Sequence, residues 1–115
     1  MTSRSYVASL VIITLTTSLC TTSCNKNNAG CNASVDCGSV TFSGTIQPLA
    51  ASTCALSGCH GGSFDSYANL SGLANNGSLM QQVVTSENMP AGNVSMSCEE
   101  RAQVECWINA GAPNN

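Results

Sequence analysis

The fold of this chain is expected to form around the stretch Cys54-Ala55-Leu56-Ser57-Gly58-Cys59-His60. Two thiols are followed directly by the only histidine of the sequence. In c-type haem attachment, two cysteines form thioether bonds with the porphyrin, and the histidine after the second cysteine ligates the iron. We therefore expect Cys54 and Cys59 to carry a covalently bound haem, with His60 as its proximal ligand.

The spacing within this stretch is longer than usual, because four residues separate the thiols where two are common. Ser57 and Gly58 make the longer loop easy to form, since glycine enters turn conformations without a steric penalty. Gly61 and Gly62, directly after the histidine, let the backbone pass close beside a flat ligand.

Zinc binding is the main alternative interpretation of the same residues. Zinc is commonly held by four cysteine or histidine side chains. The thiols and imidazole of residues 54–60 would need one more thiol, which Cys98 or Cys106 can supply. Against zinc, thiols of exported proteins tend to be oxidised to disulfides before a metal reaches them.

Length and charge limit the remaining possibilities. The 115 residues allow one small domain, and charged residues make up only 8% of them. The formal net charge is −3, with three Lys and Arg in total, so nucleic-acid binding has no electrostatic basis and no nucleic-acid partner is expected.

The N-terminal segment is typical of an export signal. Arg4 precedes the apolar run 7–19, which is too short to span a bilayer comfortably. Cys24 follows three small residues and precedes a polar run, as in the lipobox of a bacterial lipoprotein. We expect a signal peptide over residues 1–23 and a lipid on Cys24. The protein would then be exported and anchored in the membrane, facing the periplasm or the cell surface. A plainly secreted chain and an uncleaved anchor are the alternatives.

A polar tether is expected over residues 24–40, and the folded domain over 41–115. Cys31 and Cys37 lie within the tether, close enough in sequence to form a local disulfide. A bond from either cysteine to the domain is the alternative.

The last two cysteines raise a geometric problem. On a regular helix Cys98 and Cys106 lie about 12 Å apart, because each residue rises about 1.5 Å. The Cα atoms of a disulfide lie within about 7 Å. The two can pair only if Cys98 precedes regular winding; otherwise their partners are Cys31 or Cys37.

Periodicity and capping residues predict a mostly α-helical domain. Pro48 suits the first turn of a helix opened by Ser43 or Thr45, because its missing N–H has no intrahelical partner there. A second, short helix is expected within 64–73, and a third is expected to begin at Ser78.

The last helix has the clearest signature. Ser97 is followed three residues later by Glu100, the pattern of a capping box. Val104, Trp107 and Ile108 then form an apolar stripe at helical spacing.

Four segments of the chain resemble, in order, the small cytochrome c-like domains of bacterial exported lipoproteins, including the planctomycete cytochrome type. These segments are 46–49, 54–60, 89–90 and 106–113. The C-x4-C-H spacing is a variant of the family's motif. The resemblance covers most of residues 42–115. It implies a mostly helical electron-transfer domain around a covalent haem, working with a redox partner protein.

The sixth ligand of the iron is expected to be a methionine, whose sulfur binds opposite histidine in many cytochromes. Met89 precedes Pro90 in a loop and stands at the methionine-proline position of the resembling family, so we expect it to be the distal ligand. Met80 lies on a predicted apolar helix face and Met96 directly precedes the last capping box, where packing is expected. An iron with an open sixth position is the alternative.

The sequence therefore predicts electron transfer by a single haem c held by Cys54, Cys59, His60 and Met89. Two other functions stay open. One is haem-based catalysis or ligand sensing at an open sixth position, and the other is a haem-free structural or zinc-binding disulfide-rich lipoprotein. No catalytic acid–base pair or activated nucleophile is visible, so no enzyme activity is expected.

Overall fold

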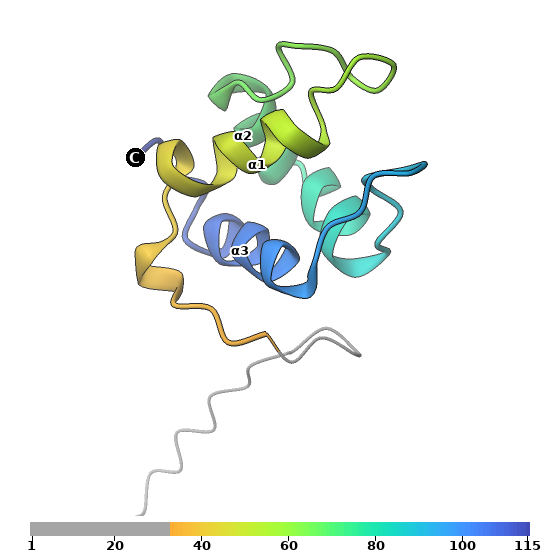
Figure 1. The fold of residues 1–115 in the computed structure, drawn as a ribbon. Coiled ribbons are helices and arrows are strands. Elements are labelled where there is room, and N and C mark those ends of the chain that lie inside the picture. The colour runs from red at the N-terminus through yellow and green to blue at the C-terminus, as the bar shows by residue number, and fades with distance from the viewer. Residues whose placement is uncertain (1–32) are drawn as a thin grey trace, which may run out of the picture.

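The computed structural model describes residues 33–115 (Figure 1). The expected signal peptide over 1–23, the lipidation site Cys24 and the tether cysteine Cys31 lie outside the described residues. The described part is a small, mostly helical domain without strands, as expected. Its elements are η1 (Cys37–Ser39), η2 (Phe42–Ile46), α1 (Gln47–Thr53), α2 (Tyr67–Asn75), η3 (Met80–Thr85) and α3 (Cys98–Asn109).

The first long helical segment begins at Phe42 and is capped by Thr41, and not by the predicted caps Ser43 or Thr45. The Thr41 hydroxyl accepts a hydrogen bond of 3.1 Å from the amide of Gly44, and the chain then makes one wide π-helical turn, η2, before α1. A Cβ atom at Gly44 would lie only 2.8 Å from the Thr41 hydroxyl oxygen, so glycine lets this cap close. Pro48 lies in the first turn of α1, as predicted.

The next two helical segments differ in detail from the prediction. The short helix expected within 64–73 is α2, which begins one residue after its cap, Ser66. Ser78 does not cap the third segment, since η3 begins at Met80 and its N-cap residue is Leu79, which makes no side-chain cap hydrogen bond. Instead the Ser78 amide donates a 2.9 Å hydrogen bond to the Asn76 side chain, which shapes the turn between the helices.

The helix α3 confirms its predicted start. The Ser97 hydroxyl accepts from the Glu100 amide at 3.2 Å, and the Glu100 carboxylate accepts from the Ser97 amide at 2.7 Å. Both halves of the capping box are therefore formed. Of the predicted apolar stripe, Val104 and Trp107 are buried, whereas Ile108 is only partly covered.

An aromatic cluster forms the centre of the core around Trp107, which is 1% exposed. The Phe42 ring meets Tyr67 edge-on at 5.2 Å and lies 5.8 Å from the Trp107 ring. The polar atoms of the cluster are also bonded: the Trp107 indole donates to the Pro113 carbonyl, and the Tyr67 hydroxyl donates to the Ala112 carbonyl. The residues that follow α3 are thus tied to the same core.

A disulfide between Cys37 and Cys106 joins η1 to α3, with the two Cα atoms 5.2 Å apart. The preferred local pairing of Cys31 with Cys37 is therefore wrong. The reason is tertiary, because η1 packs against α3 and brings two distant cysteines within reach. Cys98 is also disulfide-bonded, so the two cysteines of α3 are not bonded to each other, in keeping with the helical rise. The described structure before residue 41 includes η1 and the buried residue Val40.

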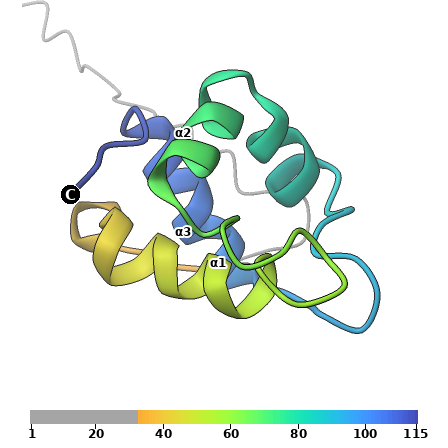
Figure 2. The ribbon, with the colours of Figure 1, turned by 90° about the horizontal axis from the view of Figure 1, so that it is seen from above.

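The two longest loops project on the same side of the domain, as Figure 1 and Figure 2 both show. The first joins α1 to α2, and the second joins η3 to α3. The helix α3 lies below α1 in Figure 1, and it contacts η1, η2 and η3. Within residues 33–115, no helix is long and apolar enough to cross a membrane.

Candidate functional site

A cavity of about 620 Å³ lies where the two long loops approach each other. Its walls come from the end of α1, the loop after it, the end of α2, η3 and the segment 89–94. Its volume falls within the roughly 300–1,000 Å³ that is typical of small-molecule and cofactor sites. The cavity is therefore large enough for a cofactor.

All four residues that the sequence singled out line this one cavity: Cys54, Cys59, His60 and Met89. The first three arrive together on the loop after α1, as their sequence order requires. Met89 arrives independently on the loop after η3, so its presence there is a property of the tertiary fold. The cavity thus combines two thiols, an imidazole and a thioether.

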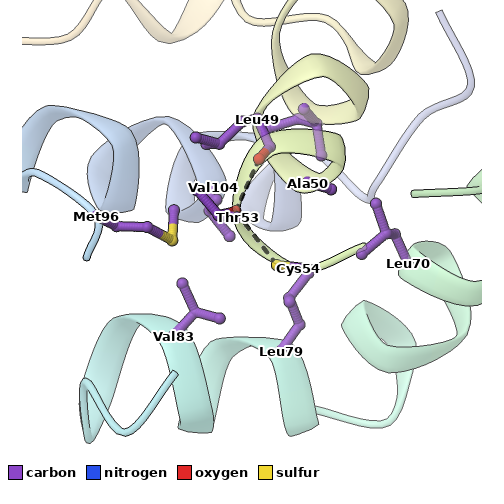
Figure 3. Close-up of a pocket in the computed structure, with 10 residues that line it drawn as sticks. Leu49, Ala50, Thr53, Cys54, Leu70, Leu79, Val83, Met96 and Val104 are labelled. Atoms are coloured by element: carbon purple, nitrogen blue, oxygen red, sulfur yellow. Dashed lines mark hydrogen bonds between the residues drawn. The ribbon is translucent and has the colours of Figure 1, made fainter. Parts of the chain in front are cut away.

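The three methionines considered as iron ligands lie in different environments in the structure. Met89 lines the large cavity. Met96 is buried in the core, where it faces Val104 and Leu49 in a small internal space (Figure 3). Met80 packs against the edge of the core and does not line the large cavity. Packing therefore accounts for Met80 and Met96, as expected from their positions.

Cys54 is placed by the last turn of α1, where it is the residue that ends the helix. The Thr53 hydroxyl donates a 2.7 Å hydrogen bond to the Leu49 carbonyl and lies 3.4 Å from the Cys54 sulfur (Figure 3). Because that hydroxyl has one proton, the Cys54 thiol is the donor to Thr53. This contact orients a partly buried, free thiol at the cavity.

The loop between the thiols is closed by its own backbone. The Cys59 amide donates to the Leu56 carbonyl at 3.0 Å, and the His60 amide donates to the Cys54 carbonyl at 3.4 Å. Gly58 lies between them with a φ of +88°, which glycine adopts without strain. The four-residue spacing is therefore accommodated by a compact turn that leaves Cys59 exposed and free.

The imidazole of His60 stacks on the Phe64 ring, with the ring centroids 4.1 Å apart and the planes 16° from parallel. His60 is otherwise exposed, and Phe64 also lines the cavity. Sequence reasoning missed this partner. Phe64 stands four positions after His60 in the sequence, and this spacing could have indicated the contact. The stacking holds the imidazole at the rim of the cavity.

The backbone of Met89 is held from two sides. Its amide donates to the Gln82 carbonyl at 3.0 Å, and its carbonyl accepts from the guanidinium of Arg101 at 3.0 Å. The Met89–Pro90 peptide bond is cis. Sequence reasoning also missed Arg101, although it stands three positions before Val104, in line with the apolar stripe of α3.

The zinc interpretation loses both of its possible fourth ligands. Cys106 is bonded to Cys37, and Cys98 is disulfide-bonded. Across residues 33–115, no group of three or more His, Cys, Asp or Glu side chains is arranged to hold a metal ion.

The donor set of the cavity fits a c-type haem. Two free thiols, an imidazole and a thioether are the groups that such a haem requires, and the wall of the cavity also includes the apolar side chains Leu73, Leu79 and Val83.

No protein-family model, curated protein or solved structure matches this chain.

Proposed function

We propose that the cavity holds one c-type haem, attached by thioether bonds to Cys54 and Cys59, and that the protein is an electron carrier. The observation that supports this proposal is the meeting of two loops at one cavity, with both thiols, His60 and Met89 in its wall. A bound haem supplies one-electron chemistry between ferric and ferrous iron.

Each residue has a distinct role in this proposal. The thioethers of Cys54 and Cys59 fix the cofactor, and the imidazole of His60 binds the iron as the proximal ligand. The sulfur of Met89 binds from the other loop, and such a soft ligand raises the reduction potential. The apolar wall around Leu79 and Val83 limits water at the site, which also tunes the potential.

The cellular setting is part of the proposal. We propose that the protein resembles the cytochrome c-like domains of exported lipoproteins, with a signal peptide over 1–23 and a lipid on Cys24. The chain would then be anchored in a membrane and exchange electrons with a redox partner protein. The disulfide between Cys37 and Cys106 supports export, because such bonds persist in oxidising compartments.

Expression with haem-maturation machinery, followed by intact-mass measurement of the denatured protein, tests the attachment. We expect one haem per chain that survives denaturation, and its loss in the double variant Cys54→Ser with Cys59→Ser. A colourless protein that folds and is exported would refute the proposal. The same measurement reports the lipid on Cys24.

The axial ligand is tested separately in the coloured protein. Met89→Leu should keep the covalent haem but lose the absorption band that arises from charge transfer between sulfur and ferric iron. Met80→Leu and Met96→Leu are matched controls and should keep the band. A wild-type protein that carries haem but lacks the band would instead favour catalysis or ligand sensing at an open sixth position.

A further inference from the structure

Arg101 is a buried cation in an acidic protein. It is the sole lysine or arginine among residues 33–115 and is only 8% exposed. A charged side chain is stable in such a place only when hydrogen bonds replace its lost water. The contacts of its guanidinium group therefore show what the side chain does.

The guanidinium of Arg101 joins two elements next to the cavity. One nitrogen, Nη1, donates to the Val83 carbonyl in η3 and to the Met89 carbonyl in the following loop. The Nε atom lies 3.8 Å from the carboxylate of Glu87, a side chain that is about half exposed. The main bonds of Arg101 are thus to backbone carbonyls, and the ion pair is the weaker contact.

These carbonyls are available because of how η3 ends. The last carbonyls of a helical segment have no intrahelical donor, and a basic side chain can satisfy them. Gln82 and Val83 use theirs for the Met89 amide and for Arg101. The hydrogen bonds of Met89 therefore come from η3 on one side and from α3 on the other.

We infer that Arg101 is a positioning residue: it holds the Met89 loop against η3 so that the methionine sulfur stays at the cavity. This inference depends on the proposed function for its consequence at the iron. Without the guanidinium, both carbonyls lose their donor and the loop is released from α3. The sulfur would then leave the iron more often and expose its sixth position.

Added imidazole competes with the Met89 sulfur for the ferric iron, so its binding affinity measures how often the sulfur leaves. We expect Arg101→Leu to weaken the sulfur-to-iron band and to tighten imidazole binding about tenfold to hundredfold, from the strength of hydrogen bonds to a charged group. Arg101→Lys keeps the charge but not the planar fork, so its effect should be intermediate. Glu87→Gln is the control for the ion pair and should change imidazole binding less than about twofold.

A second comparison separates positioning from a general loss of stability. In the Met89→Leu background, Arg101→Leu should leave imidazole binding unchanged, because the sulfur that it positions is already absent. An equal change in both backgrounds would overturn the inference. So would an Arg101→Leu protein that keeps both the band and the wild-type imidazole affinity.

A third measurement needs no haem, so it tests the positioning role of Arg101 separately from the proposed electron-carrier function. In the haem-free protein, Arg101→Lys should speed hydrogen exchange of the Met89 amide about tenfold. The Val104 amide in α3 should be unchanged. Unchanged Met89 exchange would refute the positioning role even if haem attaches. A protein that never carries haem but shows the expected exchange would refute only the proposed function.

Discussion

The two sides of this domain are built for different tasks. The aromatic side consists of Phe42, Tyr67, Trp107 and the Cys37–Cys106 disulfide. The cavity side consists of the loop from α1 to α2 and the loop from η3 to α3. On the aromatic side the Phe42 ring packs 5.2 Å from Tyr67 and 5.8 Å from Trp107, whereas the cavity side contains the cavity of about 620 Å³.

The two sides also differ in their polar groups. On the aromatic side, the Trp107 indole and the Tyr67 hydroxyl are bonded to carbonyls of the same chain. On the cavity side, Cys54 and Cys59 keep free thiols. The comparison teaches that the residues that stabilise the core and the residues with reactive thiols lie in different parts of the domain. Exposed residues at the cavity, such as Cys59 and His60, should therefore be replaceable with little loss of stability.

The largest difference is expected at the aromatic rings. Trp107→Ala should lower the free energy of unfolding by about 3–5 kcal/mol, because it leaves a cavity in a closely packed core. Phe64→Ala, on the cavity side, should cost about 1 kcal/mol in the haem-free protein, since that ring is only partly buried. Urea denaturation followed by circular dichroism measures both. Equal losses would show that the two sides do not differ in their contribution to stability.

The cysteine pairs should behave in the same unequal way. The Cys37–Cys106 bond closes a loop of sequence separation 69. Removing it by Cys37→Ser with Cys106→Ser should cost about 2–4 kcal/mol, chiefly through the greater entropy of the unfolded chain. The pair Cys54→Ser and Cys59→Ser should change the stability of the haem-free protein by less than about 1 kcal/mol. A larger loss from the second pair would mean that these thiols also support the core.

A smaller effect is expected from the start of α3. Ser97→Ala should cost about 1 kcal/mol, because it removes one half of the capping box. Ser78→Ala is a matched control at the cavity, where the serine caps no helix, and it should change stability by less than about 0.5 kcal/mol. The midpoint of thermal unfolding reports both variants. A loss at Ser78 as large as at Ser97 would contradict the assigned caps.

Local signals in the sequence were sufficient for some of these features. The start of α3 depends on contacts between Ser97 and Glu100, three residues apart, so the sequence alone predicted it. The order of residues 54–60 likewise placed three chemically relevant groups on one loop. The cap at Thr41 was missed because the chain enters α1 through a wider π-helical turn, for which the sequence has no simple periodic signal.

Other features depend on contacts between distant parts of the chain. The bond from Cys37 to Cys106 exists because η1 lies against α3, and no local pattern indicates that neighbour. Met89 was chosen for its loop and its proline, but only the tertiary fold brings it to the same cavity as Cys54. Arg101 entered only the charge count, although its place in line with an apolar stripe indicated the burial that the structure shows.

The disulfide also determines how the oxidised domain responds to mechanical force. A pull on the chain before Cys37 and after Cys106 passes through the sulfur–sulfur bond. Every residue that lines the large cavity, from Thr53 to Val94, lies inside the closed loop and bears none of that tension. Stretching the two ends can straighten the terminal segments but cannot pull the two thiols and Met89 apart. A reducing environment would remove this protection and place the cavity in the path of the load.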